Sequence, residues 1–151
     1  MSARLLRLFC LLSCVLLAAT ALAQEGHPAK GTWVGFWGPS AAQTRLVIVM
    51  DYDGKNLSGA VNPGPNAVPI KLARMDITPG KPPGKRGDPP GEPTFKLHIE
   101  AETKDAKGNS ISIVADGTMH EVGLPGRAME GTWTQTVGGK TEKGDFRIRR
   151  Q

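Results

Sequence analysis

The sequence predicts an all-β protein that folds as a single antiparallel up-and-down β-barrel of eight to nine strands. Apolar and polar residues alternate along most of residues 24–151, which is the period of a half-buried strand. The chain contains 19 glycines and 12 prolines, and they interrupt it too often for a sustained helix. Short strands at regular spacing are typical of sandwiches and barrels, and about eight strands suffice to close a barrel.

Residues 1–23 have the pattern of a secretory signal peptide. Two arginines precede an apolar run over residues 8–18, and the small-residue site Ala21-Leu22-Ala23 follows. The apolar run is too short for a membrane span, so we expect cleavage before Gln24 and a secreted or periplasmic protein. A retained anchor and lipidation at Cys14 are weaker alternatives, because no basic stop-transfer flank follows and the apolar run continues past Cys14.

Removal of residues 1–23 leaves 128 residues, enough for one β-barrel domain over 24–151. Both cysteines leave with the signal, so the mature domain has no disulfide and no thiolate. The net charge falls from +5 to +3, because Arg4 and Arg7 are lost. We expect no nucleic-acid partner, since the basic residues are not interleaved with aromatic side chains.

The expected strands follow from the alternation, and the turns between them carry Gly, Pro, Asp or Asn. Residues 44–52 give the strongest signal, with a β-branched run that is apolar on both faces. Asp53-Gly54 and Gly138-Gly139 are hairpin turns, because such turns need positive φ. In chain order the strands cover residues 32–38, 44–52, 56–62, 67–78, 94–102, 110–115, 118–122, 127–137 and 145–150.

Three irregularities are expected within these strands. Gly59 marks a bend or a close approach of another strand. The apolar phase slips by one residue between Leu72 and Met75, which predicts a β-bulge or a break near Ala73-Arg74. Residues 110–122 form either two strands or one strand broken at Asp116-Gly117.

Residues 79–93 interrupt the strand pattern. Ten of these fifteen residues are proline or glycine, which leaves little apolar surface to bury. We expect an exposed, mobile loop without a packed core.

Two similar stretches stand near the ends of the domain, Gly31-Thr32-Trp33 and Gly131-Thr132-Trp133. We interpret them as the first and last walls of the barrel, meeting at the seam. Large aromatic residues dominate cores, so the tryptophans either fill the interior or line a small apolar pocket at the barrel mouth. The candidate ligand-binding residues are Trp33, Trp37, Trp133, Leu46, Ile48, Phe95, Leu97 and Ile113.

The Gly-x-Trp motif near the start and the basic last strand resemble the calycin group, lipocalins in particular. That resemblance implies that Trp33 lies at the closed end of the barrel beneath Arg147 or Arg149. The stretch Gly131-Thr132-Trp133-Thr134-Gln135, the Gly-Gly turn and the terminal Phe-Arg-Ile-Arg-Arg also resemble a small secreted bacterial β-barrel module. That module often precedes α/β-hydrolase domains, whereas here we expect it to stand alone, with residues 79–93 as an insertion.

Catalytic patterns are weak. No histidine pair has metal-ligand spacing, and the serines lack a nucleophile-elbow context. His98 and Glu100 are expected on one outward strand face, as solvated residues. Paired carboxylates for glycoside chemistry are an open alternative, since four glutamates could meet across neighbouring strands: Glu100, Glu102, Glu121 and Glu130.

We therefore expect no enzyme, no metal and no cofactor. The first hypothesis is a non-catalytic barrel that carries a small hydrophobic molecule. The second is a filled barrel that acts as a protein-interaction or structural module and binds an envelope protein.

Overall fold

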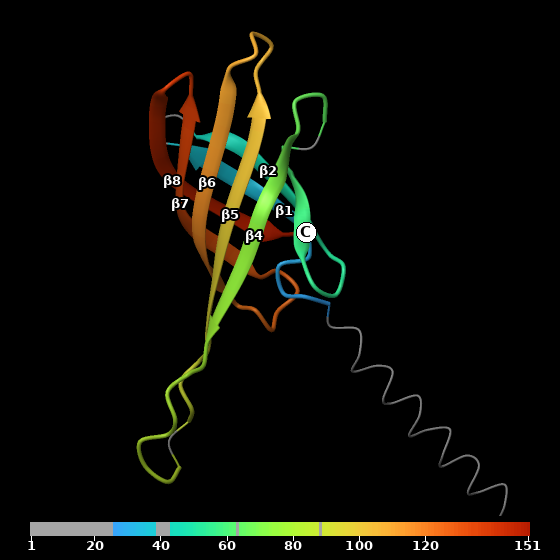
Figure 1. Cartoon of the computed structure of the whole chain (residues 1–151). Coiled ribbons are helices and arrows are strands. Elements are labelled where there is room, and N and C mark those ends of the chain that lie inside the picture. The colour runs from blue at the N-terminus through green and yellow to red at the C-terminus, as the bar shows by residue number, and fades with distance from the viewer. Residues whose placement is uncertain (1–25, 39–42, 63, 88) are drawn as a thin grey trace, which may run out of the picture.

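The computed structural model describes residues 26–38, 43–62, 64–87 and 89–151, and it confirms the predicted antiparallel up-and-down barrel. Eight strands pair in chain order and close on themselves (Figure 1). The predicted signal peptide and its cleavage site lie outside the described residues. The strands are β1 Gly31–Gly38, β2 Thr44–Tyr52, β3 Leu57–Val61, β4 Val68–Thr78, β5 Thr94–Lys104, β6 Ser110–His120, β7 Ala128–Val137 and β8 Lys140–Arg150.

The barrel closes between β1 and β8. Six residue pairs join these strands, from Trp33 opposite Arg150 to Gly38 opposite Asp145. The expected seam between the two Gly-Thr-Trp stretches is therefore wrong, because β8 lies between β1 and the Trp133 strand. The Gly138-Gly139 turn sends the chain straight back, so β8 begins at Lys140 rather than at residue 145.

β6 and β4 both differ from the irregularities expected for them. β6 is one continuous strand through Asp116 and Gly117. The β4 bulge lies at Lys71, between Ile70 and Leu72, and not at Ala73-Arg74. Lys71 is the extra residue of the bulge, and it is exposed to solvent. Regular alternation of inward and outward side chains therefore resumes at Leu72, two residues earlier than the apolar pattern indicated.

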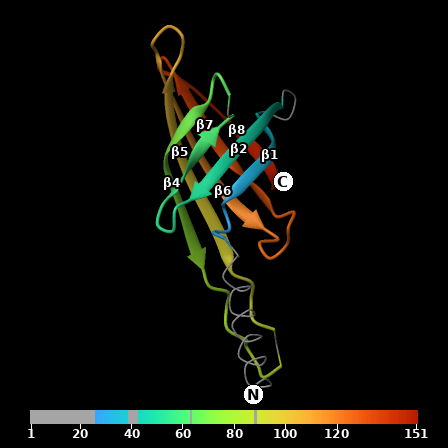
Figure 2. The same cartoon turned by 90° about the vertical axis from the view of Figure 1, so that its right-hand side faces the viewer.

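Gly59 of β3 is the close approach that the sequence predicted. Its φ is +146°, and a Cβ atom there would overlap the carbonyl oxygen of Val49 on β2. β3 is the shortest strand and pairs with β4 at two positions only, Ala60 opposite Pro69 and Val61 opposite Val68. Beyond these positions β4 continues along β5 toward residues 79–93 (Figure 2).

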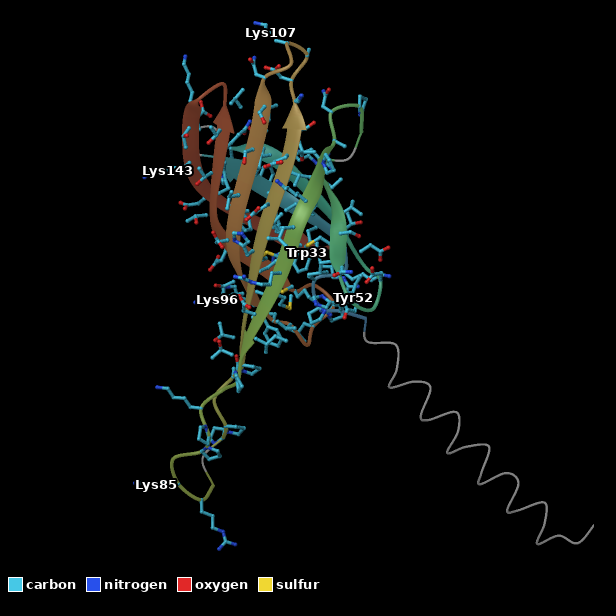
Figure 3. The ribbon with its side chains drawn as sticks, in the orientation of Figure 1. Trp33, Tyr52, Lys85, Lys96, Lys107 and Lys143 are labelled. Carbon is cyan, nitrogen blue, oxygen red and sulfur yellow. The ribbon has the colours of Figure 1, made fainter. Side chains whose placement is uncertain are left out.

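Residues 79–93 form an arm that projects from one end of the barrel (Figures 1 and 2). Its described residues are exposed apart from Gly80, as predicted. Its two legs are joined at the base, where the N–H of Gly91 donates to the carbonyl oxygen of Lys81 over 2.9 Å. We name this end of the barrel the arm end; Figure 3 shows Lys85 on the arm and Lys107 at the opposite end.

A short lead-in, residues 26–30, covers the arm end of the barrel interior. Ala29 is fully buried, and its carbonyl oxygen accepts a 2.8 Å hydrogen bond from Nε1 of the fully buried Trp33. Arg127 Nη1 donates to the carbonyl oxygen of Pro28, and Lys30 pairs with Asp51 at 2.8 Å. The lead-in is thus tied to both sides of the barrel and keeps water from Trp33.

Candidate functional site

The most conspicuous interior feature is a pair of tryptophans at the end opposite the arm. The rings of Trp37 and Trp133 lie 4.9 Å apart between centroids, tilted by 40°, a favourable geometry for an aromatic pair. Trp133 Nε1 donates to the carbonyl oxygen of Asp145 over 3.2 Å. Its strand is held close to β6 at Gly131, where a Cβ atom would overlap the carbonyl oxygen of Asp116.

The tryptophan pair borders a small internal cavity. Its volume is about 10 Å³, roughly the space that one water molecule needs. The lining offers no polar side chain except the indole of each tryptophan, and the Trp133 N–H is already bonded. The barrel interior is therefore filled by its own side chains. The lining residues are Trp37, Leu46, Ile48, Val61, Ile99, Ile113, Ala115, Trp133 and Phe146.

Five of the eight predicted ligand-binding residues meet at this cavity: Trp37, Trp133, Leu46, Ile48 and Ile113. The other three lie elsewhere. Trp33 and Leu97 are core residues outside the cavity lining, and Phe95 borders a separate hollow at the arm end.

Four lining residues were not among the predicted site residues: Val61, Ile99, Ala115 and Phe146. Alternation indicates that such residues point inward, but it does not give their height along the barrel axis.

The arginine that the lipocalin resemblance implied above Trp33 is not where it was expected. Arg147 and Arg149 lie on the outer face of β8, where they pair with Glu130 and Glu121. The residue opposite Trp33 is Arg150, whose Nε lies beside Gly31. The expectation is wrong because Trp33 and Arg150 share the inner face, and Arg147 and Arg149 alternate to the outside.

A larger hollow, about 970 Å³, lies at the arm end of the barrel, where it reaches the inward-facing side chains of Phe95 and Met119. It is bounded by the lead-in, the base of the arm, the ends of β5 and β6, and the loop over residues 121–127. Its apolar side chains are Phe95, Met119, Val122 and Leu124, and Leu124 is 56% exposed. His120, Glu121 and Glu92 add charged or polar groups to the same hollow. This hollow was not predicted from the sequence, because it is formed by three segments that are distant in sequence.

The outer face carries one histidine between two carboxylates. His98 Nδ1 lies 2.7 Å from Asp116 Oδ1, and His98 Nε2 lies 3.2 Å from Glu100 Oε1. These hydrogen bonds, the one to Asp116 first, raise the pKa of His98 above its ordinary value. The prediction that His98 and Glu100 share an outward face is confirmed. Because both ring nitrogens face carboxylates, the cluster favours a charged imidazolium that donates two hydrogen bonds.

Within residues 26–38, 43–62, 64–87 and 89–151, no three His, Cys, Asp or Glu side chains are arranged to hold a metal ion. The same residues contain no helix that is long and apolar enough to cross a membrane.

The fold and the site together define a class: a closed eight-stranded antiparallel barrel with an apolar, filled interior and an open hollow at one end. Comparison of the chain with protein-family models, with curated proteins and with solved structures gives no significant match.

Proposed function

We propose that this protein is a non-catalytic, secreted or periplasmic barrel that acts as a protein-interaction or structural module of the cell envelope. One observation carries the proposal: the interior cavity of about 10 Å³ has no room for a ligand. Small-molecule pockets in proteins measure about 300–1,000 Å³, some thirty times more at the least. A barrel whose interior is filled by side chains can bind a partner only through residues at its surface.

The hollow at the arm end is the surface feature that supports the proposal of a protein-binding site. It has the size of a ligand site, at about 970 Å³, and its apolar lining includes the half-buried Phe95 and Val122 and the exposed Leu124. The arm adds Lys81 at its base, which suits an acidic partner surface. Exposed apolar groups rimmed by charges are the usual composition of a protein interface.

Native mass spectrometry of the protein purified from its own periplasm tests the proposal. We expect the mass of the polypeptide from residue 24 onward, with no small molecule attached. A reproducible bound small molecule in stoichiometric amount overturns the proposal.

A pair of matched variants tests the hollow itself. Leu124→Glu places a charge in the hollow, and Lys107→Glu places the same charge at the opposite end. Affinity purification from the periplasm should recover a protein partner with the wild type and with Lys107→Glu but not with Leu124→Glu. Equal recovery with both variants would move the interface away from the hollow.

A second candidate function is the transport of a small apolar molecule, and the wholly apolar lining of the cavity favours it. Such a ligand would have to displace Trp37, which is only partly buried at the end opposite the arm. Titration with an apolar fluorescent probe tests this candidate through energy transfer from tryptophan. Saturable binding that is lost in Ile113→Trp, which fills the cavity, supports the carrier; the absence of saturable binding excludes it.

A further inference from the structure

β4 has a free edge along its half nearest the arm. From Leu72 to Thr78 each residue is paired with β5, from Leu72 opposite Glu100 to Thr78 opposite Thr94. On the other side, β3 reaches β4 only at Pro69 and Val68. Within the described part of the chain, no other strand pairs with Leu72–Thr78 (Figures 1 and 2).

A free edge presents unpaired backbone groups to solvent. Every second residue of a strand directs its N–H and C=O groups away from its partner strand, so this edge offers donors and acceptors to a further strand. The edge is also apolar on both faces: Leu72 is 44% exposed, and Ile77 is 56% exposed. Strand addition at such an edge is a common mode of recognition.

We propose that two copies of this chain associate through this edge, as an antiparallel pair of β4 strands with Met75 on the two-fold axis. The sheets of the two barrels then continue from β5 through β4 into the partner's β4 and β5. The inference goes beyond the proposed function, because it rests on the free edge and not on the filled interior or the hollow.

The charges of β4 favour this pairing over the two that place a charged residue on the axis. An antiparallel two-fold places one residue opposite itself and keeps inner faces together and outer faces together. With Arg74 on the axis, two arginines face each other; with Asp76 on the axis, two aspartates do. With Met75 on the axis, Arg74 of each copy faces Asp76 of the other, and opposite charges directly across strands are stabilising.

The inner face is complementary in the same register. Ile77 lies opposite Ala73 of the second copy, so a large exposed side chain meets a small one. Met75 is half-buried against the core and meets its own copy at the axis, where its flexible side chain adapts to the space. An unrelated extended peptide would satisfy the backbone equally well, but it would have no reason to match this pattern of Arg74, Asp76, Ala73 and Ile77.

The length of the pairing has fixed limits. The bulge at Lys71 ends the regular edge on one side, and Pro79, which has no N–H donor, ends it on the other. Seven residues therefore pair in each copy, and the edge is closed to further growth.

Light scattering on the mature chain after size-exclusion chromatography tests the proposal, with charge variants at two exposed positions. Asp76→Arg makes residues 74 and 76 both positive, and Arg74→Asp makes both negative. Each variant turns two attractive cross-strand pairs into two repulsive ones, so we expect the dimer dissociation constant to rise about tenfold or more. Lys143→Asp, an exposed charge change on β8 four strands away, is the control and should leave the dimer unchanged.

Complementation distinguishes this register from a general loss of folding. An equimolar mixture of Asp76→Arg and Arg74→Asp should restore a heterodimer, and the double exchange R74D/D76R should restore the homodimer. Met75→Cys introduces the only cysteine of the mature chain, and a short bis-maleimide should cross-link it within the dimer. A wild type that stays monomeric at about 500 µM, a concentration that reveals sub-millimolar association, overturns the proposal. Charge variants that dimerise as well as the wild type also overturn it, and so does a dimer without the Met75→Cys cross-link.

Discussion

Truncation of Leu46 measures whether the barrel interior is as tightly filled as its cavity indicates. Leu46 is 3% exposed and lines the internal cavity, whereas Leu124 is 56% exposed and lines the hollow at the arm end. Leu46→Ala removes three carbon atoms at about 0.8 kcal/mol each, or about 2.4 kcal/mol in transfer free energy. About 40–80 Å³ of new cavity adds about 1–2 kcal/mol, at about 24 cal/mol per Å³.

The expected loss is therefore about 3–4.5 kcal/mol in the free energy of unfolding, or about 10–15 °C in Tm for a domain of this size. Urea unfolding followed by the fluorescence of the three tryptophans measures it, and an unchanged m-value shows that the shift in midpoint is a change in stability. The same truncation at Leu124 should cost less than about 1 kcal/mol, because that side chain is already in water. If Leu46→Ala lowered the free energy of unfolding no more than Leu124→Ala, the interior would be loosely packed or hydrated, and the inference of a filled barrel would be wrong.

Three further predictions concern the outer histidine, the glycine of the second Gly-Thr-Trp stretch and the lead-in. The raised pKa of His98 stabilises the fold below its unfolded-state pKa, and this stabilisation is lost as the pH rises through the folded-state pKa. The Tm difference between wild type and His98→Gln should therefore be about 1–3 °C larger at pH 5 than at pH 8, and a larger difference at pH 8 would contradict this reasoning. Gly131→Ala should cost about 1–3 kcal/mol in chemical denaturation, because its Cβ meets the β6 backbone, while Gly123→Ala, which meets no atom within 4 Å, should change stability by less than about 0.5 kcal/mol. Trp33→Phe should cost about 1–3 kcal/mol in the same assay, because it leaves the buried carbonyl oxygen of the lead-in without its donor, and a neutral result would mean that water reaches this end.

Apolar periodicity and turn residues predicted the strands well where the strand contains several apolar residues. The strand at residues 44–52 is observed as β2 Thr44–Tyr52, and the strand at residues 94–102 is observed as β5 Thr94–Lys104. The start of β8 was missed, because Lys140–Gly144 has no apolar residue and so carries no periodic signal. Pairing with β7 makes this segment a strand, as the contact between the Thr136 and Thr141 hydroxyl groups shows.

The sequence predicted which side chains of the candidate site point into the barrel, but not how far along the barrel axis each of them lies. Trp33 and Trp133 stand in nearly identical stretches, yet Trp33 is the third residue of β1 and Trp133 is the sixth of β7. The two rings therefore lie at different heights, and Trp133 packs against Trp37 instead. The position of a side chain along the barrel axis depends on strand register, which is set by turn lengths and by bulges such as the one at Lys71. The alternation of apolar and polar residues does not indicate the register.

The free edge of β4 follows from the way in which the arm end is closed. β3 has five residues and β4 has eleven, so β3 is too short to accompany β4 to the arm. A closed barrel would normally need strand pairing there to keep water from its core. Here the lead-in performs that task, because Ala29 and Trp33 are fully buried and hydrogen-bonded to each other. Since a packed segment and not a strand covers the core, the backbone of Leu72–Thr78 keeps its pairing capacity, and this capacity is available to a second chain.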